Sequence, residues 1–67
     1  MEADVYAVKV TRGGQTFEGT YWVESGRVHV SSAYGDGSIL KGWRTPSDLA
    51  QQVFRRIVTE HLRMENQ

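Results

Sequence analysis

The chain has 67 residues, with eight basic and eight acidic side chains, two histidines and no cysteine. This length predicts one small domain, and the lack of cysteine excludes disulfides and thiolate metal sites. The balanced charge argues against a dominant nucleic-acid or membrane role, since both rely on a net basic field. A domain of this size buries only about 60% of its unfolded surface, so oligomerisation is the remaining way to gain stability.

The first half of the chain predicts a β-meander. Strands are expected over residues 5–11, 16–24 and 27–34, where β-branched and aromatic side chains alternate with polar ones. Gly13-Gly14 and Ser25-Gly26 are expected to form two-residue hairpin turns, because glycine tolerates the positive φ angles that such turns need.

These two turns imply a register that the side chains support. The opposed pairs would be Tyr6–Tyr21, Lys9–Glu18, Val10–Phe17, Trp22–His29, Val23–Val28 and Glu24–Arg27. In these pairs, side chains of opposite charge face each other and apolar side chains face apolar ones. A slip of one residue would reverse every side chain, so the agreement favours this register.

A fourth strand is expected over residues 38–43, after the turn signal Gly35-Asp36-Gly37. A loop of the last two residues of this signal would direct Ile39 and Trp43 to the core. A loop of all three would direct Leu40 there instead. The sequence does not decide between these alternatives.

A helix is predicted over residues 46–64. Thr45 is a suitable N-cap, Pro46 suits the first helical position and Asp48 suits the first turn. The apolar face consists of Ala50, Val53, Phe54, Ile57, His61 and Met64, widened by Leu49, Val58 and Leu62. Such a helix is about 27 Å long, whereas a strand covers about 23 Å. Unless the helix lies diagonally its last turn overhangs the sheet, which makes Leu62 a candidate contact for a second subunit.

The expected fold is α+β: a three- or four-stranded antiparallel β-meander with one C-terminal helix packed on one face. Lys41 and Gly42 would discourage further pairing on the edge strand. The predicted core is Val8, Val10, Phe17, Tyr21, Val23, Val28, Val30, Val53, Phe54 and Ile57. The other face of the sheet is predicted to stay open, with Val5, Ala7, Thr20, Trp22, His29 and Ser31 on it.

Trp22 is the main candidate for a partner contact. It falls among the polar, water-facing residues of its strand, where a large aromatic side chain indicates a surface that a partner covers. Val5 and His29 are expected beside it, and the imidazole of His29 is placed to stack on the indole. We therefore expect a small non-enzymatic interaction module that forms a homodimer or binds an unidentified protein, without a cofactor.

Weak nucleic-acid binding or regulation is the alternative function. Arg55, Arg56 and Arg63 share one helix face, and Lys41 precedes the helix. A solvated helix face also explains these arginines. Metal binding is not expected, because the predicted register places the two histidines, His29 and His61, on opposite sides of the sheet.

The pattern of residues 21–24 and 26–35 is followed by Pro46 and Leu49-Ala50. In these residues, the chain resembles a family of short bacterial proteins of no assigned function. Members of this family have a strand-turn-strand core, a Ser-x-Tyr-Gly turn and a C-terminal helix that begins with proline. The resemblance implies a bacterial, cytoplasmic protein and supplies no catalytic residues. No apolar run is long enough for a membrane span.

Overall fold

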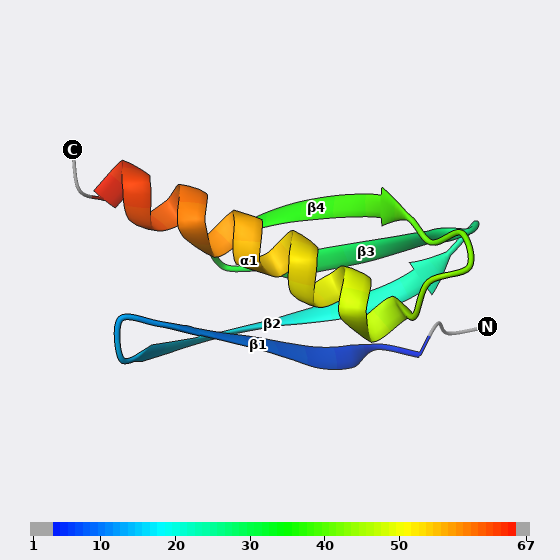
Figure 1. The fold of residues 1–67 in the computed structure, drawn as a ribbon, viewed down its shortest axis with the longest axis horizontal. Coiled ribbons are helices and arrows are strands. Elements are labelled where there is room, and N and C mark those ends of the chain that lie inside the picture. The colour runs from blue at the N-terminus through cyan, green and yellow to red at the C-terminus, as the bar shows by residue number, and fades with distance from the viewer. Residues whose placement is uncertain (1–3, 66–67) are drawn as a thin grey trace.

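The computed structural model describes residues 4–65 as a four-stranded antiparallel sheet with one helix across one face (Figure 1). The elements are β1 (Tyr6–Arg12), β2 (Gln15–Glu24), β3 (Arg27–Ser32), β4 (Gly35–Leu40) and α1 (Pro46–Glu65). The strands lie in the order β1-β2-β3-β4, each antiparallel to its neighbours. The predicted α+β meander is therefore confirmed.

Both predicted hairpins have the expected turns and register. Gly13 and Gly14 have φ angles of 58° and 78°, and Ser25 and Gly26 have 53° and 73°. Positive φ at both central residues is the type I′ geometry, which matches the twist of the flanking strands. All six predicted cross-strand pairs are present. Lys9 and Glu18 form an exposed ion pair of 3.4 Å, which contributes little to stability.

The fourth strand differs from the prediction. It runs over Gly35–Leu40 rather than residues 38–43, and β3 ends at Ser32 rather than at residue 34. The loop is Ala33-Tyr34, so neither predicted loop is correct. Ile39 faces the helix side in the observed register, as one of the two alternatives predicted.

The turn before β4 is stabilised by hydrogen bonds of Ser32 and by packing of the Tyr34 ring. Ser32 Oγ accepts a hydrogen bond from the Tyr34 N–H at 3.2 Å and donates one to the Gly35 carbonyl at 2.8 Å. The ring of Tyr34 packs 5.0 Å from Phe17 and 4.9 Å from His61, measured between centroids. Gly35 has a φ of 147°, which L side chains rarely adopt. These contacts place the turn ahead of the Gly35-Asp36-Gly37 signal.

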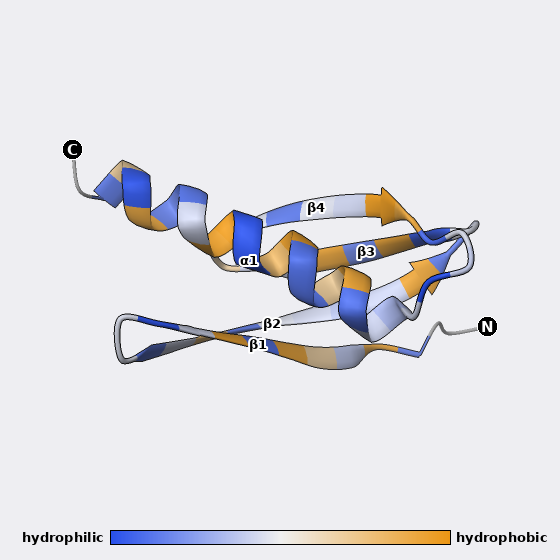
Figure 2. Cartoon of the chain, viewed as in Figure 1, coloured by the Kyte–Doolittle hydropathy of each residue, from blue (hydrophilic) through white to orange (hydrophobic). Residues whose placement is uncertain are grey.

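Helix α1 begins and ends close to the predicted residues. The first helical bond runs from the Leu49 N–H to the Thr45 carbonyl at 3.2 Å. The helix runs diagonally across the sheet, and its C-terminal end extends past the β3–β4 turn (Figure 1). Hydrophilic residues lie along its outward side (Figure 2).

The core lies between the sheet and residues 49–58 of α1. Its buried side chains are Val8, Val10, Phe17, Val28, Val30, Leu49, Ala50, Phe54 and Val58. Tyr21, Val53 and Ile57, also predicted as core, are only partly buried. The prediction for Val23 is wrong: it is 37% exposed, because it lines a hollow beside the start of the helix. Met64, predicted on the apolar face, is 76% exposed, whereas Leu49 and Val58 are fully covered.

Two glycines allow the helix to lie close to the sheet. A Cβ atom on Gly19 would lie 3.0 Å from the Ser31 carbonyl oxygen and 3.3 Å from the Phe54 ring. A Cβ atom on Gly37 would lie 2.8 Å from a methyl group of Val53. A larger residue at either position would push α1 away from β2 or β4.

Candidate functional site

Strand β4 lies at one margin of the sheet, and half of its backbone groups face away from β3. The Lys41 N–H donates to the Gly26 carbonyl at 3.0 Å, so Lys41 and every second residue before it bond toward β3. The N–H and C=O groups of Asp36, Ser38 and Leu40 therefore point away from β3 and form the free edge of the sheet. Within residues 4–65, no hydrogen bond from a side chain or a turn reaches these groups.

A groove of about 280 Å³ runs between this free edge and α1. It is lined by Asp36, Gly37, Ser38 and Ile39 on the strand side and by Gln52, Val53, Arg56 and Ile57 on the helix side. The isoleucines and Val53 are half-buried, so they still present apolar surface to the groove. An extended segment laid along β4 would find backbone partners on one side and apolar side chains on the other.

The opposite margin, strand β1, is partly blocked by the helix. The two-residue turn makes Arg12 and Gln15 a hydrogen-bonded pair, so Lys9 points its N–H and C=O outward. Gln51 Nε2 donates to that Lys9 carbonyl at 2.9 Å. Nearer the turn, the Arg12 guanidinium donates to Thr59 Oγ1 at 3.1 Å. Among the described residues, the helix thus bonds to one outward backbone group of the β1 edge and to none of the β4 edge.

Trp22 lies on the open face of the sheet, as predicted, but its ring is partly covered. The indole and the His29 imidazole stack with centroids 5.4 Å apart and planes 13° apart. Both residues are half-buried, while Val5, which precedes β1, is 58% exposed. The chain's own imidazole therefore covers one side of the indole that we expected a partner to cover.

The Trp22–His29 stack borders a shallow hollow that also includes Ser31, Asp36 and Ser38. Among the described residues, no hydrogen bond joins His29 to these hydroxyl or carboxylate groups. An activated nucleophile needs such a bond to its base. Through Asp36 and Ser38, the hollow is continuous with the free edge of β4.

Leu62 is half-buried and packs against the core, so it lies under the end of the helix rather than on its outer side. His61 also faces the sheet, and its Nε2 lies 3.3 Å from a Glu65 carboxylate oxygen. His29 and His61 are on opposite sides of the sheet, as predicted. Residues 4–65 contain no group of three or more His, Asp or Glu residues placed to hold a metal ion.

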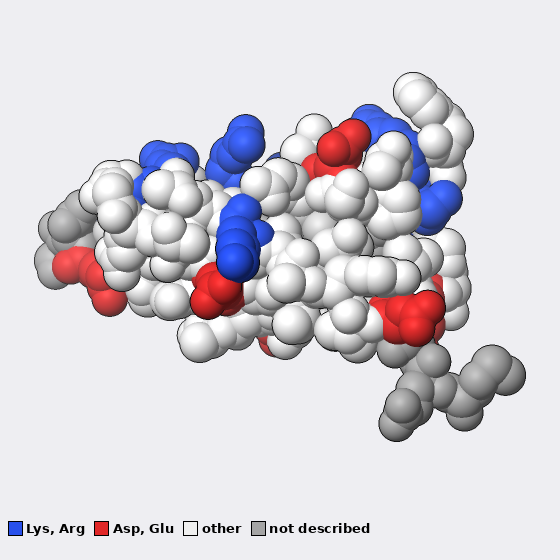
Figure 3. Space-filling view, turned by 90° about the horizontal axis from the view of Figure 1, so that it is seen from below, with Lys and Arg blue, Asp and Glu red and all other residues white. Residues whose placement is uncertain are grey.

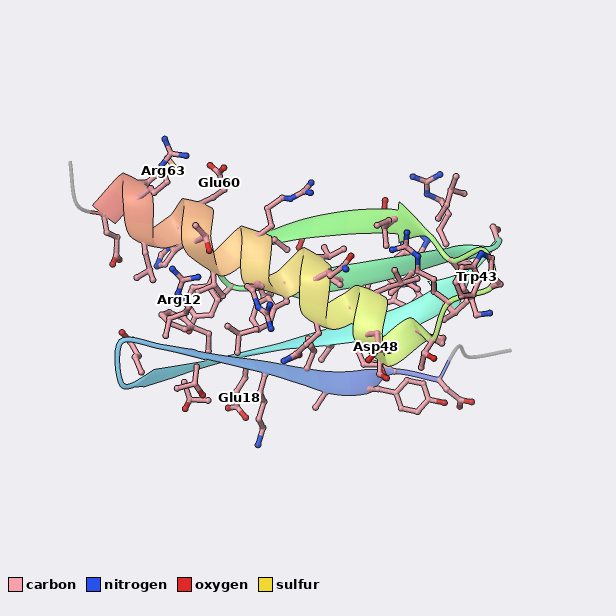
Figure 4. The ribbon with its side chains drawn as sticks, in the orientation of Figure 1. Arg12, Glu18, Trp43, Asp48, Glu60 and Arg63 are labelled. Atoms are coloured by element: carbon pink, nitrogen blue, oxygen red, sulfur yellow. The ribbon has the colours of Figure 1, made fainter. Side chains whose placement is uncertain are left out.

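The cationic residues of the nucleic-acid alternative do not form one surface. Arg55 and Arg56 border a hollow together with Arg12 and the acidic Glu60. Arg63 lies beside Glu60 near the end of α1, whereas the loop that contains Lys41 is at the opposite end of the molecule (Figures 1 and 4). Basic and acidic side chains occupy several separate places on the face shown in Figure 3.

The sequence predicted the fourth strand as an edge strand protected by Lys41 and Gly42, but both residues lie beyond the end of β4. Sequence reasoning also missed the exposure of Trp43. Trp43 is 92% exposed, contrary to the alternative that placed it in the core, and it lies in a turn at the end of the molecule (Figure 4). The Arg44 N–H donates to the Lys41 carbonyl at 3.2 Å across this turn, in which Gly42 has a φ of 58°. The Ser-x-Tyr-Gly pattern was the signal that could have located β4 correctly, since it marks the preceding turn.

Comparisons with protein-family models, with curated proteins and with solved structures find no match to this chain. Within residues 4–65, no helix is both long and apolar enough to cross a membrane. The functional interpretation therefore rests on the geometry of the two sheet edges.

Proposed function

We propose that this chain is a small, non-enzymatic protein-interaction module that binds an extended segment as a fifth strand on β4. The observation that supports this proposal is the free backbone edge at Asp36, Ser38 and Leu40, next to a groove lined by α1. Strand addition obtains affinity from main-chain hydrogen bonds and specificity from alternate side chains. Both contributions are available at this edge.

The composition and the distribution of charge favour a protein partner. Net charge is zero, and the hollow that contains Arg55 and Arg56 also contains the acidic Glu60. Nucleic-acid binding through Arg55, Arg56, Arg63 and Lys41 is the weaker alternative, because it needs a continuous basic surface. The proposal places the module in a bacterial cytoplasm, which is compatible with the absence of cysteine.

The proposal is tested by NMR on the full chain at low concentration, with a short peptide of alternating threonine and valine as the probe strand. We expect the amides of Asp36, Ser38 and Leu40 to exchange rapidly in the free protein and to become protected when the peptide is added. Chemical shifts should change along β4 and at Val53 and Ile57, because these residues line the groove. Changes confined to β1 or to the Trp22 face would contradict the proposal.

A matched pair of proline variants controls for non-specific binding. Ser38→Pro removes an N–H that faces the free edge of β4, whereas Ala7→Pro removes the equivalent outward N–H on β1. Proline is tolerated on an edge strand where the N–H faces solvent, so both variants should fold. We expect Ser38→Pro to abolish the protection and Ala7→Pro to leave it unchanged.

A further inference from the structure

The free edge of β4 is complementary to a second copy of itself. In an antiparallel arrangement centred on Ser38, Ser38 faces its counterpart and Asp36 of each copy faces Leu40 of the other. All three outward-facing residues then form hydrogen-bonded pairs, with two bonds to each pair and about six in total. A shift of this register in either direction leaves at least one of these residues unpaired.

The charges at the two ends of β4 are also complementary in this arrangement. Asp36 lies at the start of the strand, while Leu40 at its end is opposed to Arg27 on β3. Side chains at all three positions are on the open face of the sheet. Antiparallel pairing therefore brings the carboxylate of one copy toward the guanidinium of the other, across Leu40. A parallel pairing of the two free edges would instead turn one sheet over, so the open faces would lie on opposite sides and these charges would not meet.

Leu40 gives a third reason to expect a second copy. Its side chain is 67% exposed, and the hollow that contains Ser31 and Asp36 borders the position that Leu40 of the other copy would occupy. Pairing would therefore remove apolar surface from water at both ends of the strand. The segment itself is short, about 20 Å, so the interface is at the small end of the range and the dimer should be weak.

We propose that the segment bound by β4 is the β4 strand of a second copy, which joins two sheets into one continuous eight-stranded sheet with twofold symmetry. This inference rests on the proposed function, because it names the occupant of the same edge. It agrees with the homodimer expected from the small size of the domain, but moves the interface from Trp22 and Leu62 to β4.

Sedimentation measurements on the full chain, from the micromolar to the millimolar range, test this inference. We expect a monomer–dimer equilibrium whose dissociation constant rises at least about tenfold in Ser38→Pro, because the central pair of hydrogen bonds is lost. Ala7→Pro should leave the dissociation constant unchanged. A monomer at every concentration would overturn the inference, as would a dimer that is weakened equally by the two variants.

A charge-reversal experiment separates self-pairing from any effect of the variants on folding. Asp36→Lys alone and Arg27→Glu alone should each weaken the dimer by about threefold to tenfold at low salt, because each places like charges across the interface. An equimolar mixture of the two variants should recover wild-type affinity, since both contacts of the mixed dimer are again between opposite charges. Failure of the mixture to recover would overturn the proposed register.

The two proposals fail in different ways. If the chain is monomeric but the threonine–valine peptide still protects the β4 amides, the second copy is the wrong occupant and the strand-binding function stands. If a dimer forms while these amides stay unprotected, self-association uses another surface and the second-copy inference fails. If the peptide also leaves them unprotected, the strand-binding function fails as well.

Discussion

The two margins of the sheet differ although one helix lies across both. At β1, Gln51 and Thr59 of α1 bond to Lys9 and Arg12, so part of that edge is already occupied. At β4, the helix contributes apolar side chains that line a groove, and no side chain of residues 4–65 bonds to the outward backbone groups. Natural proteins usually block exposed strand edges because such edges recruit other strands. The contrast indicates that the neighbouring helix, as well as the strand's own sequence, decides whether an edge strand is free to pair with another strand.

The contrast depends on how much the contacts of each edge strand contribute to the stability of the fold. Substitution of one tyrosine near the start of each strand tests this. Tyr34, before β4, packs between Phe17 and His61 and is half-buried, whereas Tyr6, at the start of β1, is 51% exposed. We expect Tyr34→Ala to lower the free energy of unfolding by about 2–3 kcal/mol, since it leaves a cavity beneath the turn. Tyr6→Ala should lower it by about 1 kcal/mol, because only its cross-strand contact with Tyr21 is lost.

Urea denaturation of the two tyrosine variants provides the measurement. Equal losses of stability would show that the β3–β4 turn is not anchored as described. A larger loss for Tyr6→Ala would reverse the comparison and make β1 the more firmly held edge.

The block at β1 is tested by a neighbouring pair of glutamines. Gln51→Ala removes the bond to the Lys9 carbonyl, so we expect a loss of about 1 kcal/mol in the free energy of unfolding. It should also increase association at high concentration, because the β1 edge becomes available. Gln52→Ala is the control for the loss of stability only, because Gln52 also lines the β4 groove. Gln52 is exposed, and no hydrogen bond is formed by its side chain among the described residues. The same loss of stability in both variants would mean that Gln51 does not protect the edge.

The first three strands and the helix could be predicted because local sequence determines them. The Gly13-Gly14 and Ser25-Gly26 turns fix the register of the hairpins, and Pro46 marks the start of the helix. These features depend on residues that are close in the chain. The order of the strands followed from the short turns that connect them.

The fourth strand could not be predicted because tertiary contacts position its turn. Gly35-Asp36-Gly37 has the composition of a loop, yet the packing of Tyr34 under the helix places the turn earlier. The glycines at positions 35 and 37 then lie beneath α1, where Ile57 and Val53 leave little room for a side chain. The residues of the candidate site were missed for the same reason, since the expected edge strand over residues 38–43 included Lys41 and Gly42, which lie beyond β4. Trp22 and His29 were correctly paired, but the extent to which the stack covers the indole depends on side-chain conformation.

The smallest effect is expected at the two surfaces that the sequence favoured for dimerisation. Trp22→Ser removes the stack with His29 but no backbone group of β4, and Leu62→Ser alters a side chain that packs inside the fold. We expect both variants to lower stability, Trp22→Ser by about 1 kcal/mol or less. Neither should change the dissociation constant of the dimer by more than about twofold in sedimentation experiments, a shift well below the tenfold assigned to loss of the β4 bonds. A shift to monomer in Trp22→Ser with Ser38→Pro unaffected would return the interface to the open face. That result would also show that the free edge of β4 is not the surface on which this chain self-associates.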